Sequence, residues 1–218
     1  LNYSFYPKGL LPFHNYKTHV STAFKEHLLE ATLCASSNNH ANLHFTVSEA
    51  HSEMFRNELE SIQAELEKET NTKFDVSFSC QSKSTDTIAI TASNELYRNP
   101  DGSLLFRPSG HGALIENLNM LDYDLIFIKN VDNIVVFDQN KPLSDYKKLI
   151  AGVLLKIQEQ AFKYMNKFDE DEILEDEIYN IELFVLNRLN VNLGEAYKEL
   201  SIEEKIGYLR DKLNKPIR

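Results

Sequence analysis

Asp132 is the residue whose position in this sequence most directly suggests chemistry. It follows Leu125-Ile126-Phe127-Ile128, an apolar run without alternation that predicts a strand covered on both faces. Ligands of open α/β sheets bind outside the carboxyl ends of the strands. A carboxylate there, flanked by Asn130 and Asn133, can hold Mg²⁺ with water and substrate phosphates. Asp and Asn are also common turn residues, and the spacing alone favours a turn.

Two further short segments have residue types that suit an anionic ligand. Gly110-His111-Gly112 precedes a predicted helix, and glycine lets backbone N–H groups approach a ligand at a helix amino terminus. Lys8, within Pro7-Lys8-Gly9, can reach a phosphate as a mobile charge. For motifs this short, a glycine-containing loop and a surface lysine are the simpler interpretations.

Metal and disulfide chemistry of the usual kinds is not indicated. His40, His44 and His51 have no cysteine at ligand spacing, so core or surface histidines are favoured over zinc ligands. Cys34 and Cys80 are the only cysteines, which argues against a disulfide framework and suits a reducing cytoplasm.

Charge is unevenly distributed along the chain. The net charge is −10, but segment 49–69 carries −5 and segment 169–182 carries −8, so the remainder is slightly positive. No basic stripe is visible, which argues against nucleic-acid binding, while a small anionic ligand stays open. The acidic run 169–172 lacks the central glycine of a calcium loop and predicts a solvated helix start. No apolar run approaches a membrane span, and no signal peptide is visible.

Hydrophobic periodicity places these residues on an α/β part of the chain. The pattern predicts a helix from about Ser21, a strand over 42–47, a helix capped by Ser48, a strand over 74–80 and a hairpin around Asn99–Gly102. The apolar stripes of the two helices consist of Phe24, Leu28, Ala31 and Ala35, and of Phe55, Leu59, Ile62 and Leu66. We therefore expect a mixed, mostly parallel sheet with flanking helices over residues 1–140.

From residue 141 onward the pattern is helical throughout. One stripe runs from Ile150 to Phe168 and a second from Leu174 to Leu189, and Ser201-Ile202-Glu203-Glu204 is a capping box. We expect residues 141–218 to form an all-helical extension packed on the α/β core, since each stripe needs a cover.

In order along the chain, several of these motifs resemble those of the UDP-sugar pyrophosphorylases, which have the nucleotide-diphospho-sugar transferase fold. The Pro-x-Gly-His-Gly element at 108–112 is similar to that of UTP–glucose-1-phosphate uridylyltransferases. Nearly the whole chain is similar to a bacterial domain-of-unknown-function family, family 4301, most strongly at 111–118 and 128–133. The motifs of the pyrophosphorylase resemblance are Pro7-Lys8-Gly9, Thr46-Val47-Ser48 with Phe55, Gln81-Ser82, Pro108–Gly112 and Val131-Asp132-Asn133.

The resemblance implies a nucleotidyltransferase that joins a nucleoside triphosphate and a sugar phosphate with Mg²⁺. It would assign Asp132 to the metal and Lys8 to a phosphate. Gly110, His111, Gly112 and Asn133 would line the nucleotide and sugar site, with Gln81 near the nucleobase. Ser109 and Ala113 depart from the usual pattern, which affects the choice of nucleotide and sugar.

Two other functions stay open on the same resemblance. One is a nucleotide-sugar-binding module without chemistry, and the other is a glycosyltransferase on the same fold. Related families carry a glycine-rich loop before the Pro-Lys element, and that loop is absent from these 218 residues. We therefore expect an incomplete fold and an internal fragment that is inactive alone. Nothing in the sequence indicates an oligomeric state.

Overall fold

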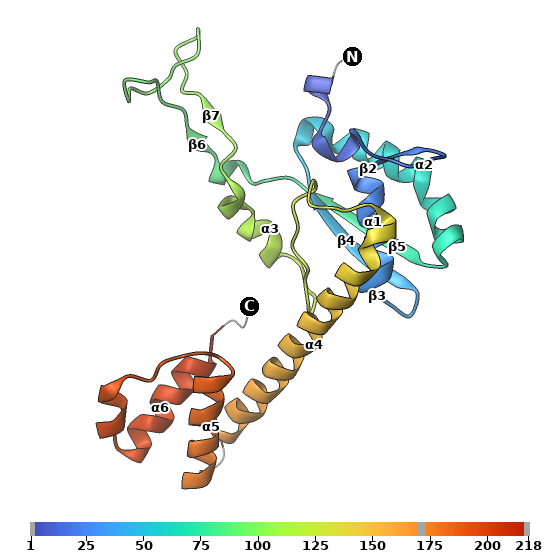
Figure 1. Ribbon diagram of the computed structural model, residues 1–218. Coiled ribbons are helices and arrows are strands. Elements are labelled where there is room, and N and C mark those ends of the chain that lie inside the picture. The colour runs from blue at the N-terminus through green and yellow to red at the C-terminus, as the bar shows by residue number, and fades with distance from the viewer. Residues whose placement is uncertain (1–2, 170–172, 216–218) are drawn as a thin grey trace. The chain divides into compact units, whose positions relative to one another are not determined.

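The computed structural model describes residues 3–169 and 173–215, drawn in Figure 1. The chain divides into two compact units, residues 1–145 and 146–218. The sequence predicts a boundary after residue 140, and the packing of the helical part on the α/β part stays a prediction.

A three-stranded sheet is the centre of the first unit. Its strands are β3 (Ser36–Ser37), β4 (His40–Thr46) and β5 (Lys73–Ser79), in the order β3-β4-β5. β3 and β4 form an antiparallel hairpin whose two turn residues, Asn38 and Asn39, have φ values of 51° and 59°. Asparagine tolerates this left-handed conformation, which a two-residue hairpin turn requires. β4 and β5 are parallel over seven residue pairs, so their carboxyl ends meet at one edge.

Two helices cover the apolar face of this sheet. They are α1 (Ala23–Cys34) and α2 (Ser52–Thr70), beside β4 and β5 in Figure 1. Residues of both helices and both strands form one buried cluster of Phe24, Leu28, Ala31, Ala41, Val47, Phe55, Leu66 and Phe74. The predicted core stripes are thereby confirmed, except that Ala35 is the exposed residue after the end of α1.

The residues that cap the amino termini of α1 and α2 differ from the predicted ones. Thr22, rather than Ser21, caps α1, because its side chain accepts a hydrogen bond from the Lys25 N–H. Ser48 precedes a short 3₁₀ turn instead of α2 and makes no capping hydrogen bond to the backbone. The Ser48 hydroxyl contacts His51 Nδ1 at 2.6 Å, so the predicted cap of the second helix is wrong.

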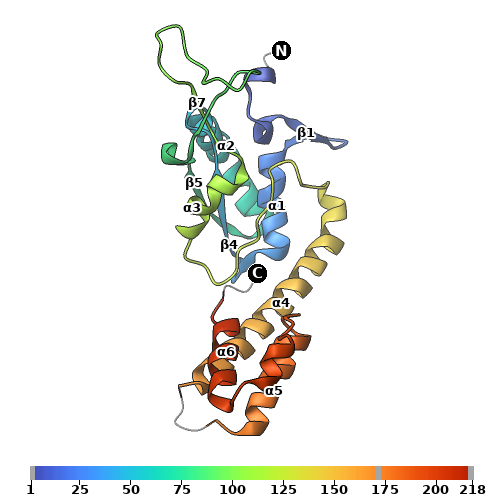
Figure 2. The same cartoon turned by 90° about the vertical axis from the view of Figure 1, so that its left-hand side faces the viewer.

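The opposite face of the sheet is polar. Because side chains alternate along a strand, Asn42, His44 and Thr46 of β4 share this face with Asp75, Ser77 and Ser79 of β5. The short helix α3 (Ile115–Asn119) lies on this side, as Figure 2 shows. One apolar and one polar face is the pattern predicted for β5, and it is confirmed.

Two small antiparallel sheets complete the first unit. β1 (Pro12–Asn15) pairs with β2 (Val20–Thr22), and β6 (Thr87–Ile88) pairs with β7 (Phe106–Arg107). Between β6 and β7 the chain makes the predicted turn, in which Asn99 bonds to Ser103 and Gly102 has a φ of 84°. This hairpin extends away from the three-stranded sheet (Figure 1).

The expected large, mostly parallel sheet is not present in the described residues. Only β4 and β5 are parallel, and the sheets have two or three strands each. Residues 125–128 form no strand, and Ile128 is 73% exposed. An apolar run becomes a strand only where a neighbouring strand accepts its backbone hydrogen bonds, and none pairs with this one in the part that the structure describes. The unit is therefore a mixed α/β structure with short sheets.

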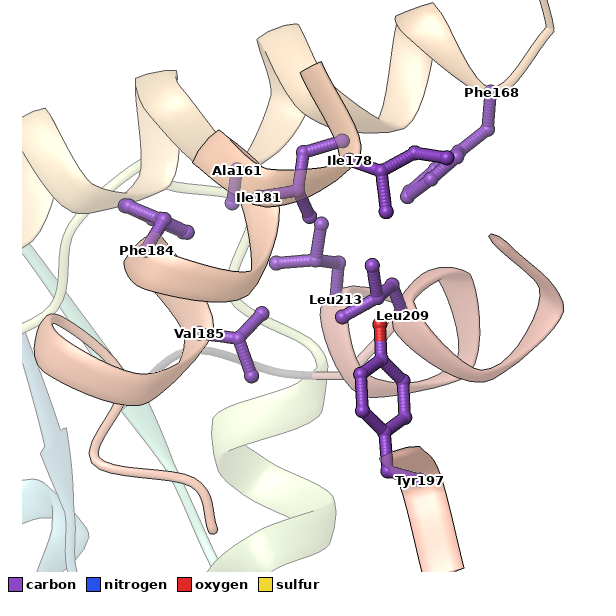
Figure 3. Close-up of a cluster of buried hydrophobic side chains, with 9 residues drawn as sticks. All are labelled: Ala161, Phe168, Ile178, Ile181, Phe184, Val185, Tyr197, Leu209 and Leu213. Atoms are coloured by element: carbon purple, nitrogen blue, oxygen red, sulfur yellow. The ribbon is translucent and has the colours of Figure 1, made fainter. Parts of the chain in front are cut away.

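The second unit is helical, as predicted. It contains α5 (Glu175–Asn187), α6 (Ile202–Leu213) and most of α4 (Phe137–Lys167), which begins in the first unit. Side chains of the three helices meet in the cluster of Figure 3, which comprises Ala161, Phe168, Ile178, Ile181, Phe184, Val185, Tyr197, Leu209 and Leu213. The six 3₁₀ helices of the described chain are η1 (Tyr3–Phe5), η2 (Lys8–Leu10), η3 (Glu49–His51), η4 (Lys83–Thr85), η5 (His111–Leu114) and η6 (Glu195–Glu199).

The predicted details of this unit are confirmed in part. Ser201 and Glu204 form the capping box at the start of α6. Ile178, Ile181 and Val185 of the second stripe are buried, whereas Ile150 of the first stripe is 67% exposed. The predicted helix start at 169–172 lies mostly outside the described residues.

Candidate functional site

Lys8 and Asp132, which are far apart in the sequence, lie next to each other. Lys8 Nζ is 3.2 Å from Asp132 Oδ2, across 124 residues of chain. Lys8 opens η2, and Asp132 belongs to the irregular segment between α3 and α4. Both side chains are accessible, with 75% and 42% of their surfaces exposed. The pair is therefore open to a ligand from solvent.

The surroundings of Asp132 keep its carboxylate ionised. The hydrogen bond from Lys8 lowers the pKa of Asp132, with smaller contributions from the Asp132 N–H and the Lys8 charge. The smallest contribution to the lower pKa of Asp132 is electrostatic and comes from His111. Lys8 and Asp132, two of the predicted site residues, are thus in direct contact.

Gly9 fixes the close approach of η2 to the rest of the unit. A Cβ atom at this position would lie 2.9 Å from the ring of Phe55 and 3.0 Å from Val131 Cγ2. Only glycine fits such a contact without displacing its neighbours. Gly9 thereby holds Lys8 beside the residue that precedes Asp132, a role that the sequence alone does not reveal.

The irregular segment that carries Asp132 ends in a set of polar contacts. His14 Nε2 donates to the Ile134 carbonyl at 3.1 Å. The Phe137 N–H donates to the Tyr16 hydroxyl at 2.8 Å, and that hydroxyl donates to Glu26 Oε2 at 3.0 Å. Burial is the main reason why the pKa of Tyr16 is raised, so the hydroxyl keeps the proton that it donates.

Gly110-His111-Gly112 forms an exposed turn instead of a long helix start. Gly110 precedes η5, and Cβ atoms added at Gly110 or Gly112 would meet no heavy atom within 4 Å. The backbone here has open space beside it, as a ligand-contacting loop requires. The helix that follows is a 3₁₀ turn joined to the five residues of α3, so it offers little of the expected helix dipole.

Asn117 holds this turn against the carboxyl end of β5. Its side chain is 3% exposed, and its Nδ2 donates to Ser79 Oγ at 2.7 Å and to the Cys80 carbonyl at 2.9 Å. His44 Nε2 contacts the same Ser79 Oγ at 2.8 Å, and burial lowers the pKa of His44, which favours the neutral ring. Asn117 was not predicted as a site residue, although it belongs to segment 111–118, where the similarity to the family is strong.

The remaining predicted residues lie in local turns. Gln81 follows β5, and its Nε2 donates to Thr85 Oγ1 at 3.1 Å. The Asn133 N–H donates to the Asn130 carbonyl at 3.0 Å, and the Asn133 side chain is exposed. Within the described chain, no hydrogen bond or ion pair joins Gln81 or Asn133 to Lys8 or Asp132.

A metal ion at this place would find few protein ligands. Residues 3–169 and 173–215 contain no group of three or more His, Cys, Asp or Glu side chains placed to hold a metal. With Asp132 as its one carboxylate ligand, Mg²⁺ would need water molecules and ligand phosphates to fill its remaining coordination positions. His44 contacts the hydroxyl groups of Ser77 and Ser79, and His51 contacts the Ser48 hydroxyl and the Phe5 carbonyl.

The comparison with family models decides which family the chain is part of. The model of the domain of unknown function DUF4301 matches residues 1–218. The chain belongs to this family. Searches of curated proteins and of solved structures find no match to this DUF4301 chain. In the parts of the DUF4301 chain that the structure describes, no helix is long and apolar enough to cross a membrane.

Proposed function

We propose that the Lys8–Asp132 site binds the phosphates of a nucleotide with Mg²⁺ and belongs to a nucleotidyltransferase active in the full-length protein. The observation that carries this proposal is the 3.2 Å approach of a lysine and an aspartate that are 124 residues apart. These are the two charged residues to which the resemblance to UDP-sugar pyrophosphorylases gives the phosphate and metal roles.

The reaction would join a sugar 1-phosphate to a nucleoside triphosphate. A phosphate oxygen of the sugar phosphate attacks the α-phosphorus, the bond to the β-phosphate oxygen breaks, and pyrophosphate leaves. The nucleophile is already ionised, so the site needs no general base. It has to bring two anions together and offset their charge, which suits a site built around an exposed ammonium group.

In the absence of a ligand, Lys8 and Asp132 offset each other's charge. A triphosphate carries more negative charge than one carboxylate, so it competes for the Lys8 ammonium group. Release of Lys8 leaves the Asp132 carboxylate able to hold Mg²⁺, which would neutralise phosphate charge. His111 and the open backbone at Gly110 and Gly112 would contact the nucleotide and the sugar phosphate, with Gln81 and Asn133 at the margin of the site.

Asp132→Asn and Lys8→Met test the binding step. We expect each to weaken Mg²⁺-dependent nucleotide binding by roughly 10-fold or more, measured by calorimetry, because each removes one charge of the pair. Matched controls are Asp145→Asn and Lys141→Met, since that exposed pair has a similar Nζ–Oδ2 distance of 3.3 Å. Equal affinities in the Asp132 variant and the wild-type chain would remove Asp132 from the metal role.

Turnover is tested on the full-length protein. Mg²⁺ and a panel of triphosphates and sugar 1-phosphates are supplied, and pyrophosphate release is measured. Release with one pair supports the transferase. Nucleotide binding without release with any pair favours a binding module.

A further inference from the structure

The segment that carries Asp132 is held in place without regular secondary structure of its own. Residues 121–136, between α3 and α4, contain no helix or strand. Backbone that is not in a sheet or helix needs other partners to keep one conformation. At Lys129 and Val131, these partners are side chains of α1, and the opposite side of this helix faces the apolar core.

Glu30 of α1 provides the first contact. Lys129 Nζ donates to Glu30 Oε1 at 3.0 Å and to Oε2 at 2.8 Å. The Glu30 side chain is only 6% exposed, and that of Lys129 is 23% exposed. Removing the cation from a buried carboxylate strongly destabilises the folded state. This ion pair therefore favours one position of Lys129 against α1.

His27, one turn before Glu30, provides the second contact. Its Nε2 lies 3.0 Å from the Val131 carbonyl oxygen. The carbonyl can only accept, so Nε2 carries the proton and Nδ1 is the ring nitrogen that faces Glu30 Oε2, at 3.8 Å. The His27 ring therefore lies between the Glu30 carboxylate and the backbone immediately before Asp132, and a ring that is protonated on both nitrogens forms an ion pair with Glu30 as well.

The other side of Val131 is in contact with Gly9, the residue after Lys8. Val131 thus lies between α1 and η2. Asp132 follows Val131 in the chain, and Lys8 precedes Gly9. A shift of Val131 away from α1 would change the distance between Lys8 Nζ and Asp132 Oδ2.

We propose that Glu30 is a positioning residue that, through Lys129 and His27, holds Asp132 opposite Lys8. The part that concerns ligands rests on the proposed function. The part that concerns the position of Asp132 does not depend on it.

Hydrogen exchange of the backbone amides tests the positioning directly. In Glu30→Gln, and in Lys129→Met, which changes a less buried group, we expect the Asn133 amide, which donates to the Asn130 carbonyl within 128–133, to exchange roughly 10-fold faster or more. Amides of β4 and β5 should keep their exchange rates. Lys129→Arg retains a cation that can bond both carboxylate oxygens, so it should restore slow exchange.

Glu67→Gln is the matched control. Glu67 is also a partly buried carboxylate bound to a lysine, with Lys73 Nζ at 2.6 Å, but it joins α2 to β5 and does not contact 128–133. It should leave exchange in 128–133 unchanged. Unchanged exchange in both Glu30→Gln and Lys129→Met would overturn the proposal, as would acceleration in Lys129→Arg equal to that in Lys129→Met.

Nucleotide titration separates this proposal from the proposed function. With Mg²⁺–UTP as the probe, Glu30→Gln and Lys129→Met should bind several-fold more weakly than the wild-type chain, with Lys129→Arg near wild type. If the wild-type chain binds no nucleotide, the proposed function fails, and the exchange measurements still decide whether Glu30 positions Asp132. Wild-type binding that is unaltered in variants with accelerated exchange would overturn the link to the ligand.

Discussion

The two units of the chain are stabilised in different ways. In residues 146–218, aliphatic and aromatic side chains of three helices form one cluster, and ion pairs such as Lys163–Glu159 and Lys198–Glu195 are largely exposed, whereas Lys167–Glu177 is partly buried. In residues 1–145, an apolar cluster covers one face of the sheet, and buried charged groups such as Glu26 and Glu30 lie on the outer side of α1.

This difference indicates where specific geometry is needed. Apolar packing tolerates small displacements, whereas a buried carboxylate has to keep its partner at hydrogen-bond distance. Buried charges are found in the unit that holds the candidate site, next to the segment of Asp132.

The largest expected effect is on the aromatic core of the first unit. Phe24 is fully buried, with its ring 4.7 Å from that of Phe45 and 5.4 Å from that of Phe55. Phe24→Ala should lower the free energy of unfolding by about 3 to 5 kcal/mol, from lost burial and the cavity left behind. Denaturant titration measures the loss, with the 56% exposed Phe106 as the matched control for Phe→Ala. A loss no greater than that of Phe106→Ala would contradict this description of the core.

A smaller effect is expected in the helical unit. Ile181 is fully buried in the cluster of Figure 3, so Ile181→Ala should cost about 2 to 4 kcal/mol. Hydrogen exchange should accelerate in α5 and α6 and stay unchanged in β4 and β5 if the units unfold separately. Ile202→Ala, at a 47% exposed position, is the control. Equal acceleration in both units would show that they unfold as one.

The smallest expected effect concerns Glu67 of α2, which forms an ion pair with Lys73 of β5. Hydrogen bonds from Lys73, Gln63 and the Phe74 N–H lower the pKa of Glu67 to about 2. The native state therefore favours the ionised carboxylate, and its contribution is complete above pH 4.5 and lost as the pH falls towards 2. Glu67→Gln should cost about 1 to 2 kcal/mol at pH 7 and almost nothing at pH 2. A difference between variant and wild type that does not change with pH would contradict this.

Much of the secondary structure of both units could be predicted because its signals are local. The stripes of α1 and α2, the alternation in β5 and the capping box at Ser201 depend on residues close in sequence, and the structure has them there. The predicted strand at 125–128 fails because pairing depends on distant partners that periodicity does not report. The expected large sheet fails for the same reason.

The candidate site was only partly predictable. Lys8, His111 and Asp132 were singled out by residue type and position, and the resemblance added their expected roles, but no spacing rule places residues 124 positions apart at 3.2 Å. His27 and Glu30 were missed because the apolar stripe of α1 reports only its inner face, and Gly9 was noted only as part of the Pro7-Lys8-Gly9 motif. Segment 121–136 contacts the other side of α1 through Lys129, which bonds the buried Glu30.

The contacts between α1 and the Asp132 segment also bear on the order in which the chain assembles. The bonds from Lys129 to Glu30 and from His27 to Val131 span 99 and 104 residues, so they close large loops. Such contacts form late, because the entropy of the intervening chain has to be lost first. A ribosome releases α1, α2 and both parallel strands well before Asp132. We expect a nascent chain to have its sheet and no Lys8–Asp132 pair, which forms only when the later segment docks.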